Sequence, residues 1–370
     1  MANIMDYLNW RGDIPFDVSP FNEVDNLIFS ELSYIHLAGL QPEDGRPVPL
    51  RAIIPPYLKK YGEGGNYMGK LLTGPYLELL KKVADSRRYE NLWLTAGVNR
   101  IVADMNKQFS AFTYTVPGLF SYVAFRGTDD TIIGWREDCN MAFQDHIPAQ
   151  EDAVQYLKES AAMVSEPLYV GGHSKGGNLA VYAAAKAPNE VKRRIRHIYS
   201  NDGPGFDRSF FETEEYMLIR NRVTLIMPKC SIIGAIFDQD CEQRIVECDR
   251  QGVMAHDGFC WDVLGTDFVR ADSLVKSSRA FQLGMNRALK GMTREEKREF
   301  TDSMFNALTV TGAKTITDLT KLRPKEALKI GQQFTNHREI LIVFSRIFQE
   351  SLHGYISERK AQQTVVSQGL

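Results

Sequence analysis

The chain has 370 residues, of which 44% are hydrophobic and 24% charged, and its formal net charge is -2. This length is enough for one large domain or one domain with an appendage, and the composition is ordinary for a soluble globular protein. A nearly neutral chain gives no reason to expect nucleic-acid binding. No run of 18 apolar residues predicts a transmembrane segment, and the first residues lack the basic and apolar segments of a secretory signal.

Cysteine usage indicates the compartment. The chain has an odd number of cysteines and no CxxC pair, which favours reduced thiols over a disulfide framework or a zinc site. We therefore expect a cytoplasmic protein. The five positions are Cys139, Cys230, Cys241, Cys248 and Cys260.

The N-terminal part of the chain predicts helices, followed by strands. A helix is expected after Ser19-Pro20, with apolar residues at helical spacing up to Ile35. Residues 41–75 are rich in turn residues, and a short helix is expected over 76–83. Strands are expected over 98–103, 109–114 and 119–125. The last of these is apolar almost throughout, as is typical of a strand buried on both faces.

The middle of the chain predicts a parallel sheet. An amphipathic helix over 150–164 separates strand 119–125 from an apolar strand over 168–170. A strand, helix and strand in this order form a right-handed βαβ unit. Further strands are expected over 197–200, 223–227 and 244–248.

Helices dominate the C-terminal part. One is expected over 273–289, and Thr293-Arg294-Glu295-Glu296 is a capping box that opens the next. At least one more is expected within 325–358, and the tail from Lys360 is polar and expected to be disordered. The apolar residues expected to be buried in the last helix are Ile340, Leu341, Val343, Phe344 and Ile347.

One pentapeptide carries a chemical signal. Gly172-His173-Ser174-Lys175-Gly176 fits G-x-S-x-G and lies between the strand at 168–170 and an alanine-rich helix over 178–187. In this context the pattern predicts a nucleophile elbow, a strained turn that presents the serine oxygen above the strand ends. Small neighbours are needed because the turn is crowded. The alternative is a glycine-rich turn that only packs or cradles a phosphate.

An activated serine needs a histidine base on a loop beyond the strand ends. Of the histidines that follow Ser174, His256 lies in a glycine-bounded loop after the last expected strand. We therefore predict His256 as the base. The other histidines are less suitable, because one precedes a strand and two lie in the helical C-terminal region: His197, His337 and His353.

Two segments resemble the class 3 (fungal-type) lipases. Their oxyanion and nucleophile motifs are similar to Tyr122-Val123-Ala124-Phe125-Arg126-Gly127-Thr128, with Trp135 and Asp138 beyond, and to Gly172-His173-Ser174-Lys175-Gly176-Gly177-Asn178-Leu179-Ala180. Up to about residue 270 the chain looks more closely like the Mbeg-like family of bacterial lipase-like α/β-hydrolases. The further matching segments are Asp6-Tyr7-Leu8-Asn9-Trp10-Arg11-Gly12, Gln108-Phe109-Ser110-Ala111, Asn201-Asp202-Gly203-Pro204-Gly205 and His256-Asp257.

The resemblance implies a serine esterase or lipase-like hydrolase. Ser174 would be the nucleophile and His256 the general base. Thr128, through its backbone N–H and its hydroxyl, and the backbone N–H of Lys175 would form the oxyanion hole. His173 would be a fixture of the elbow.

The acid is where this sequence departs from the lipases. Those enzymes place an aspartate after the strand that resembles 223–227, and here that position holds Pro228-Lys229-Cys230-Ser231. We predict Asp202, which follows the preceding strand, with Asp238 or Asp240 as alternatives. A dyad without an acid, or an inactive site, is a further alternative. Asp202 also stands in Asn-Asp-Gly-Pro-Gly, which is a strong turn by itself.

Two other features remain open. Lys175 replaces the leucine usual in the lipases, and its side chain is expected in solvent or, alternatively, against an anionic group of the substrate. The apolar segment 232–237 is interpreted as the lining of an acyl pocket, a lid or a buried turn.

The sequence thus predicts an α/β-hydrolase fold, a mostly parallel sheet with helices on both faces, over residues 1–270 with a core from about 20. A helical extension over 271–358 and a disordered tail over 359–370 are expected to follow. The expected reaction is hydrolysis of a small-molecule or lipid ester through an acyl-enzyme on Ser174, without metal or organic cofactor. The rival hypothesis is a non-catalytic protein that uses this fold to bind a partner.

Overall fold

The computed structural model describes residues 2–41, 45–63, 74–102, 107–337, 340–343, 345, 346 and 349. The predicted tail over 359–370 and the predicted burial of Phe344 and Ile347 lie outside these residues, as does His353. Within the described residues, no helix is long and apolar enough to cross a lipid bilayer.

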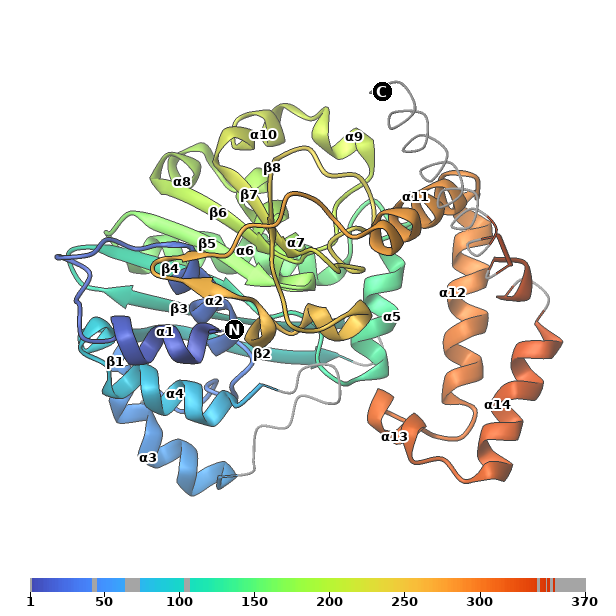
Figure 1. Ribbon diagram of the computed structural model, residues 1–370, viewed down its shortest axis with the longest axis horizontal. Coiled ribbons are helices and arrows are strands. Elements are labelled where there is room, and N and C mark those ends of the chain that lie inside the picture. Colours follow the sequence, from blue (N-terminus) through green and yellow to red (C-terminus); the bar gives the residue numbers. More distant parts are fainter. Residues whose placement is uncertain are drawn as a thin grey trace, which may run out of the picture.

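An eight-stranded sheet forms the centre of the molecule (Figure 1). Its strands lie side by side in chain order, antiparallel from β1 to β4 and parallel from β4 to β8. The strands are β1 (Val48–Pro49), β2 (Trp93–Val102), β3 (Lys107–Val116), β4 (Phe120–Phe125), β5 (Leu168–His173), β6 (Ile195–Asn201), β7 (Val223–Pro228) and β8 (Glu242–Val246). A two-stranded ribbon, β9 (Val263–Leu264) and β10 (Asp267–Phe268), stands apart.

Helices cover both faces of the sheet. Successive side chains of a strand point to opposite faces, and β4 divides accordingly: Tyr122 and Ala124 pack with the N-terminal helices, whereas Val123 and Phe125 pack with the crossover helices. The first four helices are α1 (Ile4–Arg11), α2 (Glu23–Leu32), α3 (Leu50–Tyr61) and α4 (Tyr76–Asp85). The crossover helices are α6 (Pro148–Met163), α7 (Lys175–Lys186), α8 (Asn189–Arg194), α9 (Arg208–Phe211) and α10 (Glu214–Met217). The predicted fold class is confirmed.

The start of α2 differs from the prediction. Asn22, not Ser19, caps the helix, because its side chain accepts hydrogen bonds from the backbone N–H groups of Val24 and Asp25. The Asp25 side chain accepts in return from the Asn22 backbone. Asparagine is as good a cap as serine, and the preceding Ser-Pro pair belongs to the incoming loop.

The C-terminal helices lie beside α5 (Ile132–Asn140), which follows β4 (Figure 1). They are α11 (Lys276–Lys290), α12 (Arg294–Thr309), α13 (Ile316–Thr320) and α14 (Pro324–Asn336). Thr293 caps α12 in the predicted capping box. A small apolar cluster of Ile132, Phe305 and Ala313 joins α12 to α5. Ile340 and Val343 are buried as expected, but Leu341 is exposed. The prediction that Leu341 is buried is therefore wrong, because its side chain projects from a different face of the helix than those of Ile340 and Val343.

Candidate active site

Ser174 occupies the turn between β5 and α7. Its backbone angles are φ 60° and ψ -134°, a region that a residue with a side chain rarely adopts. The backbone N–H of Ser174 donates to the carbonyl of Asn201 in β6 at 2.9 Å, which fixes the turn to the sheet. The side chain is nearly buried, at 9% exposed. This is the geometry expected of a nucleophile elbow.

The glycines around Ser174 are required by crowding. A Cβ atom on Gly172 would lie 2.3 Å from the carbonyl oxygen of Phe125, and one on Gly176 would lie 2.0 Å from the same oxygen. A Cβ on Gly177 would lie 2.5 Å from the Ser200 hydroxyl oxygen in β6. Glycine at these positions therefore lets α7 start directly against the sheet.

Asp202 and His256 meet above the ends of the parallel strands. Asp202 directly follows β6, and His256 ends the short 3₁₀ helix Gly252–His256 that follows β8. The Nδ1 of His256 lies 2.6 Å from Oδ2 of Asp202, and both side chains are buried. With Nδ1–H donating to the carboxylate, Nε2 is left as the acceptor, which is the tautomer that a general base needs.

The loop after β7 holds the second oxygen of Asp202. Oδ1 accepts from the Ser231 hydroxyl at 2.5 Å and from the backbone N–H of Gly234 at 3.1 Å. The resemblance to class 3 lipases implies an acid after this strand, but the loop here has no carboxylate at Pro228-Lys229-Cys230-Ser231, and Asp202 was predicted as the acid. Here the loop supplies hydrogen-bond donors instead, and they hold the carboxylate of the preceding strand end in place.

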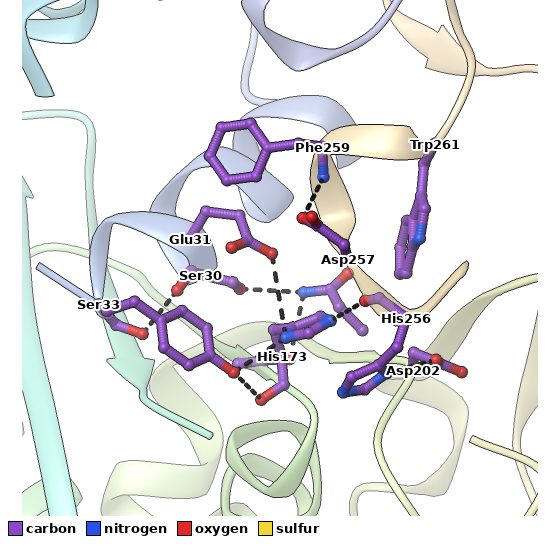
Figure 2. A network of polar contacts seen from close by, with 12 residues as sticks. Ser30, Glu31, Ser33, His173, Asp202, His256, Asp257, Phe259 and Trp261 are labelled. Atoms are coloured by element: carbon purple, nitrogen blue, oxygen red, sulfur yellow. Dashed lines mark hydrogen bonds and ion pairs between the residues drawn. The ribbon is translucent and has the colours of Figure 1, made fainter. Parts of the chain in front are cut away.

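A buried network lies behind His256 (Figure 2). The ring of His173 lies 4.3 Å from that of His256, and its Nε2 lies 2.6 Å from the His256 carbonyl oxygen. Its Nδ1 lies 2.9 Å from the Tyr34 hydroxyl. Burial, and then the neighbouring His256, hold the pKa of His173 well below its usual value. A neutral His173 therefore donates from Nε2 to the backbone of the histidine loop and accepts from Tyr34.

The buried network also contains the carboxyl group of Glu31 (Figure 2). Its Oε2 accepts from the Tyr76 hydroxyl at 3.2 Å, and Oε1 lies 3.9 Å from Nδ1 of His173. Burial, and then the Asp257 carboxylate, raise the pKa of Glu31 well above its usual value. Sequence reasoning missed Glu31 and Tyr34, because a segment without a motif gives no signal of contact with His173, which lies 139 residues after Tyr34.

The turn that carries Thr128 lies against the elbow. A Cβ on Gly127 would lie 2.6 Å from the His173 carbonyl oxygen and 2.8 Å from the Ser174 Cβ. Lys175 is the first residue of α7, so its backbone N–H has no acceptor within the helix. The Thr128 hydroxyl donates to Asp138 at 2.6 Å. The backbone N–H groups, rather than this hydroxyl, are therefore the available donors for an oxyanion.

The Lys175 side chain is not where the sequence predicted. It is buried, with Nζ 2.8 Å from Oε2 of Glu137 and 3.1 Å from the Gln108 carbonyl oxygen. Burial alone would lower the pKa of Lys175, but the Glu137 and Asp138 carboxylates raise it above the usual value. The prediction of a side chain in solvent is wrong, and an ammonium paired with Glu137 is not available to an anionic substrate.

The other candidate residues lie apart from Ser174. Asp238 forms an ion pair with Lys290, and Asp240 with Arg220. His197 lies within β6 beside the Thr224 hydroxyl, and His337 follows α14. Among the described residues, no group of three His, Cys, Asp or Glu side chains is arranged to hold a metal ion.

A cavity of about 280 Å³ lies beside Ser174. Most of its lining is apolar, and it includes three residues of the segment after β7: Ile233, Ile236 and Phe237. Of the three alternatives left open for segment 232–237, the structure shows the lining of a pocket next to the elbow. Other parts of the lining come from the elbow, α5, α11 and α12.

Comparison with known protein families identifies the family of this chain. The Mbeg1-like family matches residues 83–306, more than half of the chain. The chain belongs to the Mbeg1-like family. The match begins before β2 and ends within α12, so the predicted boundary at residue 270 stays a prediction. No curated protein matches the sequence.

Two solved structures resemble this Mbeg1-like protein. M37 lipase is 16% identical, with a TM-score of 0.33, over 56% of this chain and 68% of that one. The second is Rhizomucor miehei lipase, in a propeptide complex of a deletion mutant. It is 15% identical, with a TM-score of 0.36, over 66% of this chain and 78% of that one. Similarity at this level does not bear on the chemistry of the Mbeg1-like chain, which rests on its own side chains.

Proposed function

We propose that this protein is a serine hydrolase that cleaves carboxylic esters through an acyl-enzyme on Ser174. The observation that supports this most strongly is the 2.6 Å contact between Asp202 and His256 beside the strained Ser174 turn. A module that only binds partners has no use for a strained serine beside a buried pair of histidine and aspartate.

The proposed reaction follows from these roles. Ser174 Oγ attacks the ester carbonyl while Nε2 of His256 takes its proton, and Asp202 stabilises the imidazolium that forms. The backbone N–H groups of Thr128 and Lys175 receive the oxyanion. His256 then returns the proton to the departing alcohol. In the second half a water molecule, deprotonated by His256, attacks the acyl carbonyl. The bond from the acyl group to Ser174 Oγ breaks, His256 returns the proton to Oγ, and the acid leaves.

The surroundings support an uncharged acyl group. The cavity beside Ser174 is lined mostly by apolar side chains, and the Lys175 ammonium is neutralised by Glu137. The same machinery can transfer other acyl groups, so thioesters and amides belong in the substrate panel. All five cysteines are free thiols, which supports the proposal of a reducing, cytoplasmic location.

Turnover of short p-nitrophenyl esters tests the proposal. Wild type is expected to release p-nitrophenol with a pre-steady-state burst of one equivalent, and Ser174→Ala and His256→Ala are expected to lose turnover by at least about 10³-fold. Ser209→Ala and His146→Ala, which alter exposed or half-exposed residues, are matched controls and should behave as wild type. A folded wild type without turnover of any ester, thioester or amide would instead favour the non-catalytic rival.

A further inference from the structure

The C-terminal helices form one wall of the cavity beside Ser174. Met285 and Leu289 of α11 line it, as do Phe300 and Met304 of α12. These residues lie more than 100 positions after the serine and outside the βα units that build the elbow. The cavity is therefore incomplete without α11 and α12.

Specific contacts hold α11 against the other wall. The Asn286 side chain accepts from the backbone N–H of Phe237 at 2.9 Å and donates to its carbonyl at 3.2 Å. Phe237 itself lines the cavity and has a positive φ of 67°. The two hydrogen bonds thus fix an unfavourable backbone conformation and couple the loop after β7 to α11.

Contacts with α5 hold α12 in the same way. Arg136 of α5 donates to Asp302 of α12 at 2.5 Å, and Phe305 is buried against Ile132. These links hold α12 beside α5 (Figure 1). The wall is therefore part of the packed structure.

The side chains of this wall suit a flexible hydrocarbon chain. The α11 and α12 residues that line the cavity are apolar except for Thr301 and Lys297, and the Thr301 hydroxyl donates to the carbonyl of Lys297 within the helix. Methionine side chains are flexible and polarizable, so they adapt to a ligand with many conformations. The main polar groups outside this wall are Ser174 and Lys175 at the elbow, and Asp138 of α5, whose Oδ1 lies 3.6 Å from Nζ of Lys175.

We infer that α11 and α12 set the length of the acyl chain that the enzyme accepts, with Leu289 and Met304 as specificity-determining residues. This inference rests on the proposed ester hydrolysis at Ser174. A cavity of about 280 Å³ is large enough for an acyl chain of medium length, and octanoate represents this length in the experiment.

Chain-length profiles of the full-length protein test the inference. In wild type, kcat/KM for p-nitrophenyl esters is expected to rise from acetate to octanoate by up to about fourfold per methylene. Leu289→Trp and Met304→Trp, which fill the cavity, are expected to lower the octanoate-to-acetate ratio by at least about tenfold. Leu289→Ala, which enlarges it, is expected to move the optimum to longer chains.

Leu328→Trp is the matched control, because it makes the same change on an exposed face of α14. Its octanoate-to-acetate ratio and its acetate turnover should both equal those of wild type. If the cavity variants hydrolyse both esters with the wild-type ratio, the inference is overturned while ester hydrolysis stands.

Binding of 1-octanol to Ser174→Ala, followed by isothermal titration calorimetry, separates the two claims. Saturable octanol binding that is abolished by Leu289→Trp supports the role of α11 and α12 in binding the chain. This holds even if wild type hydrolyses no ester, in which case only the proposed function is wrong. Absence of octanol binding, together with a chain-length profile that does not rise from acetate to octanoate, overturns the inference.

Discussion

Each oxygen of the Asp202 carboxylate has a distinct partner. Oδ2 faces Nδ1 of His256, while Oδ1 accepts from Ser231 and Gly234. Three donors converge on a side chain that is fully buried. An aspartate held in place in this way fixes both the orientation and the tautomer of the histidine.

Asp202→Asn tests whether Asp202 fixes the tautomer of His256. Because Ser231 and Gly234 both donate, the oxygen of the asparagine is expected to face them and its NH₂ group to face His256, which forces the wrong tautomer. We expect kcat to fall by about 10⁴-fold with the fold intact, measured with p-nitrophenyl esters and circular dichroism. Asp238→Asn and Asp240→Asn change surface ion pairs and should leave kcat within about twofold. A larger loss in either variant would move the acid to that loop.

Glu31 gives a pH prediction. Its pKa is raised above the ordinary value of 4.5, so the folded state retains a proton that the unfolded chain has lost. The resulting stabilisation is complete below pH 4.5 and disappears as the pH rises through the pKa of the folded state. The side chain in Glu31→Gln cannot ionise. The free energy of unfolding of this variant should therefore increase relative to that of wild type as the pH rises from 4 to 9.

Urea unfolding at several pH values measures the difference between Glu31→Gln and wild type. A difference that stays constant over this range would show that Glu31 is ionised in the folded state. Glu159→Gln, on the exposed face of α6, is the control for changing a carboxylate at the surface.

At the scale of elements, the buried pair of Lys175 and Glu137 joins the start of α7 to α5. Glu137 also accepts from the backbone N–H groups of Gln108 in β3 and Ala149 in α6. One carboxylate therefore connects four elements around the elbow. Removing one partner would leave the other charge buried without compensation.

A double-mutant cycle measures this connection. Lys175→Met and Glu137→Gln are each expected to lower the free energy of unfolding by about 3–5 kcal/mol. The double variant should lose less than the sum of the two, because neither charge then remains. Additive losses in urea unfolding would mean that the two side chains do not interact in solution.

Much of the sheet could be predicted because local patterns determine it. Apolar runs gave most strands, and the βαβ pattern gave the parallel half. The helix over Ile132–Asn140 was not predicted, because its charged and polar residues show no clear apolar face. The end of β2 was predicted at residue 103, and its bounds beyond Val102 lie outside the described residues.

The site residues could be predicted from the sequence where they belong to a motif or follow from the order of the fold. Ser174 and His256 follow from spacing and fold order, and Asp202 was preferred over two other aspartates. Ser231, Glu137 and Tyr34 act through contacts with residues far along the chain, and a single sequence gives no signal of such pairing. Lys175 was misplaced for this reason: its partner Glu137 lies on another helix.

At the scale of the whole molecule, α12 is joined to the α/β core through Phe305. This side chain is 3% exposed and packs against Ile132 of α5. Phe305→Ala is expected to lower the free energy of unfolding by about 3–5 kcal/mol and to impair octanoate hydrolysis more than acetate hydrolysis. Leu328→Ala, on exposed α14, should change neither. Loss of stability with an unaltered chain-length profile would contradict the coupling.

Reaction with a fluorophosphonate, followed by peptide mass spectrometry, tests the central claim most directly. The reagent phosphonylates only serines whose hydroxyl is activated, and its use needs no knowledge of the substrate. We predict one adduct per chain, on Ser174, absent in Ser174→Ala and strongly slowed in His256→Ala. A folded wild-type protein that stays unmodified, or that is modified at another serine, would contradict the assignment of Ser174 as a catalytic nucleophile.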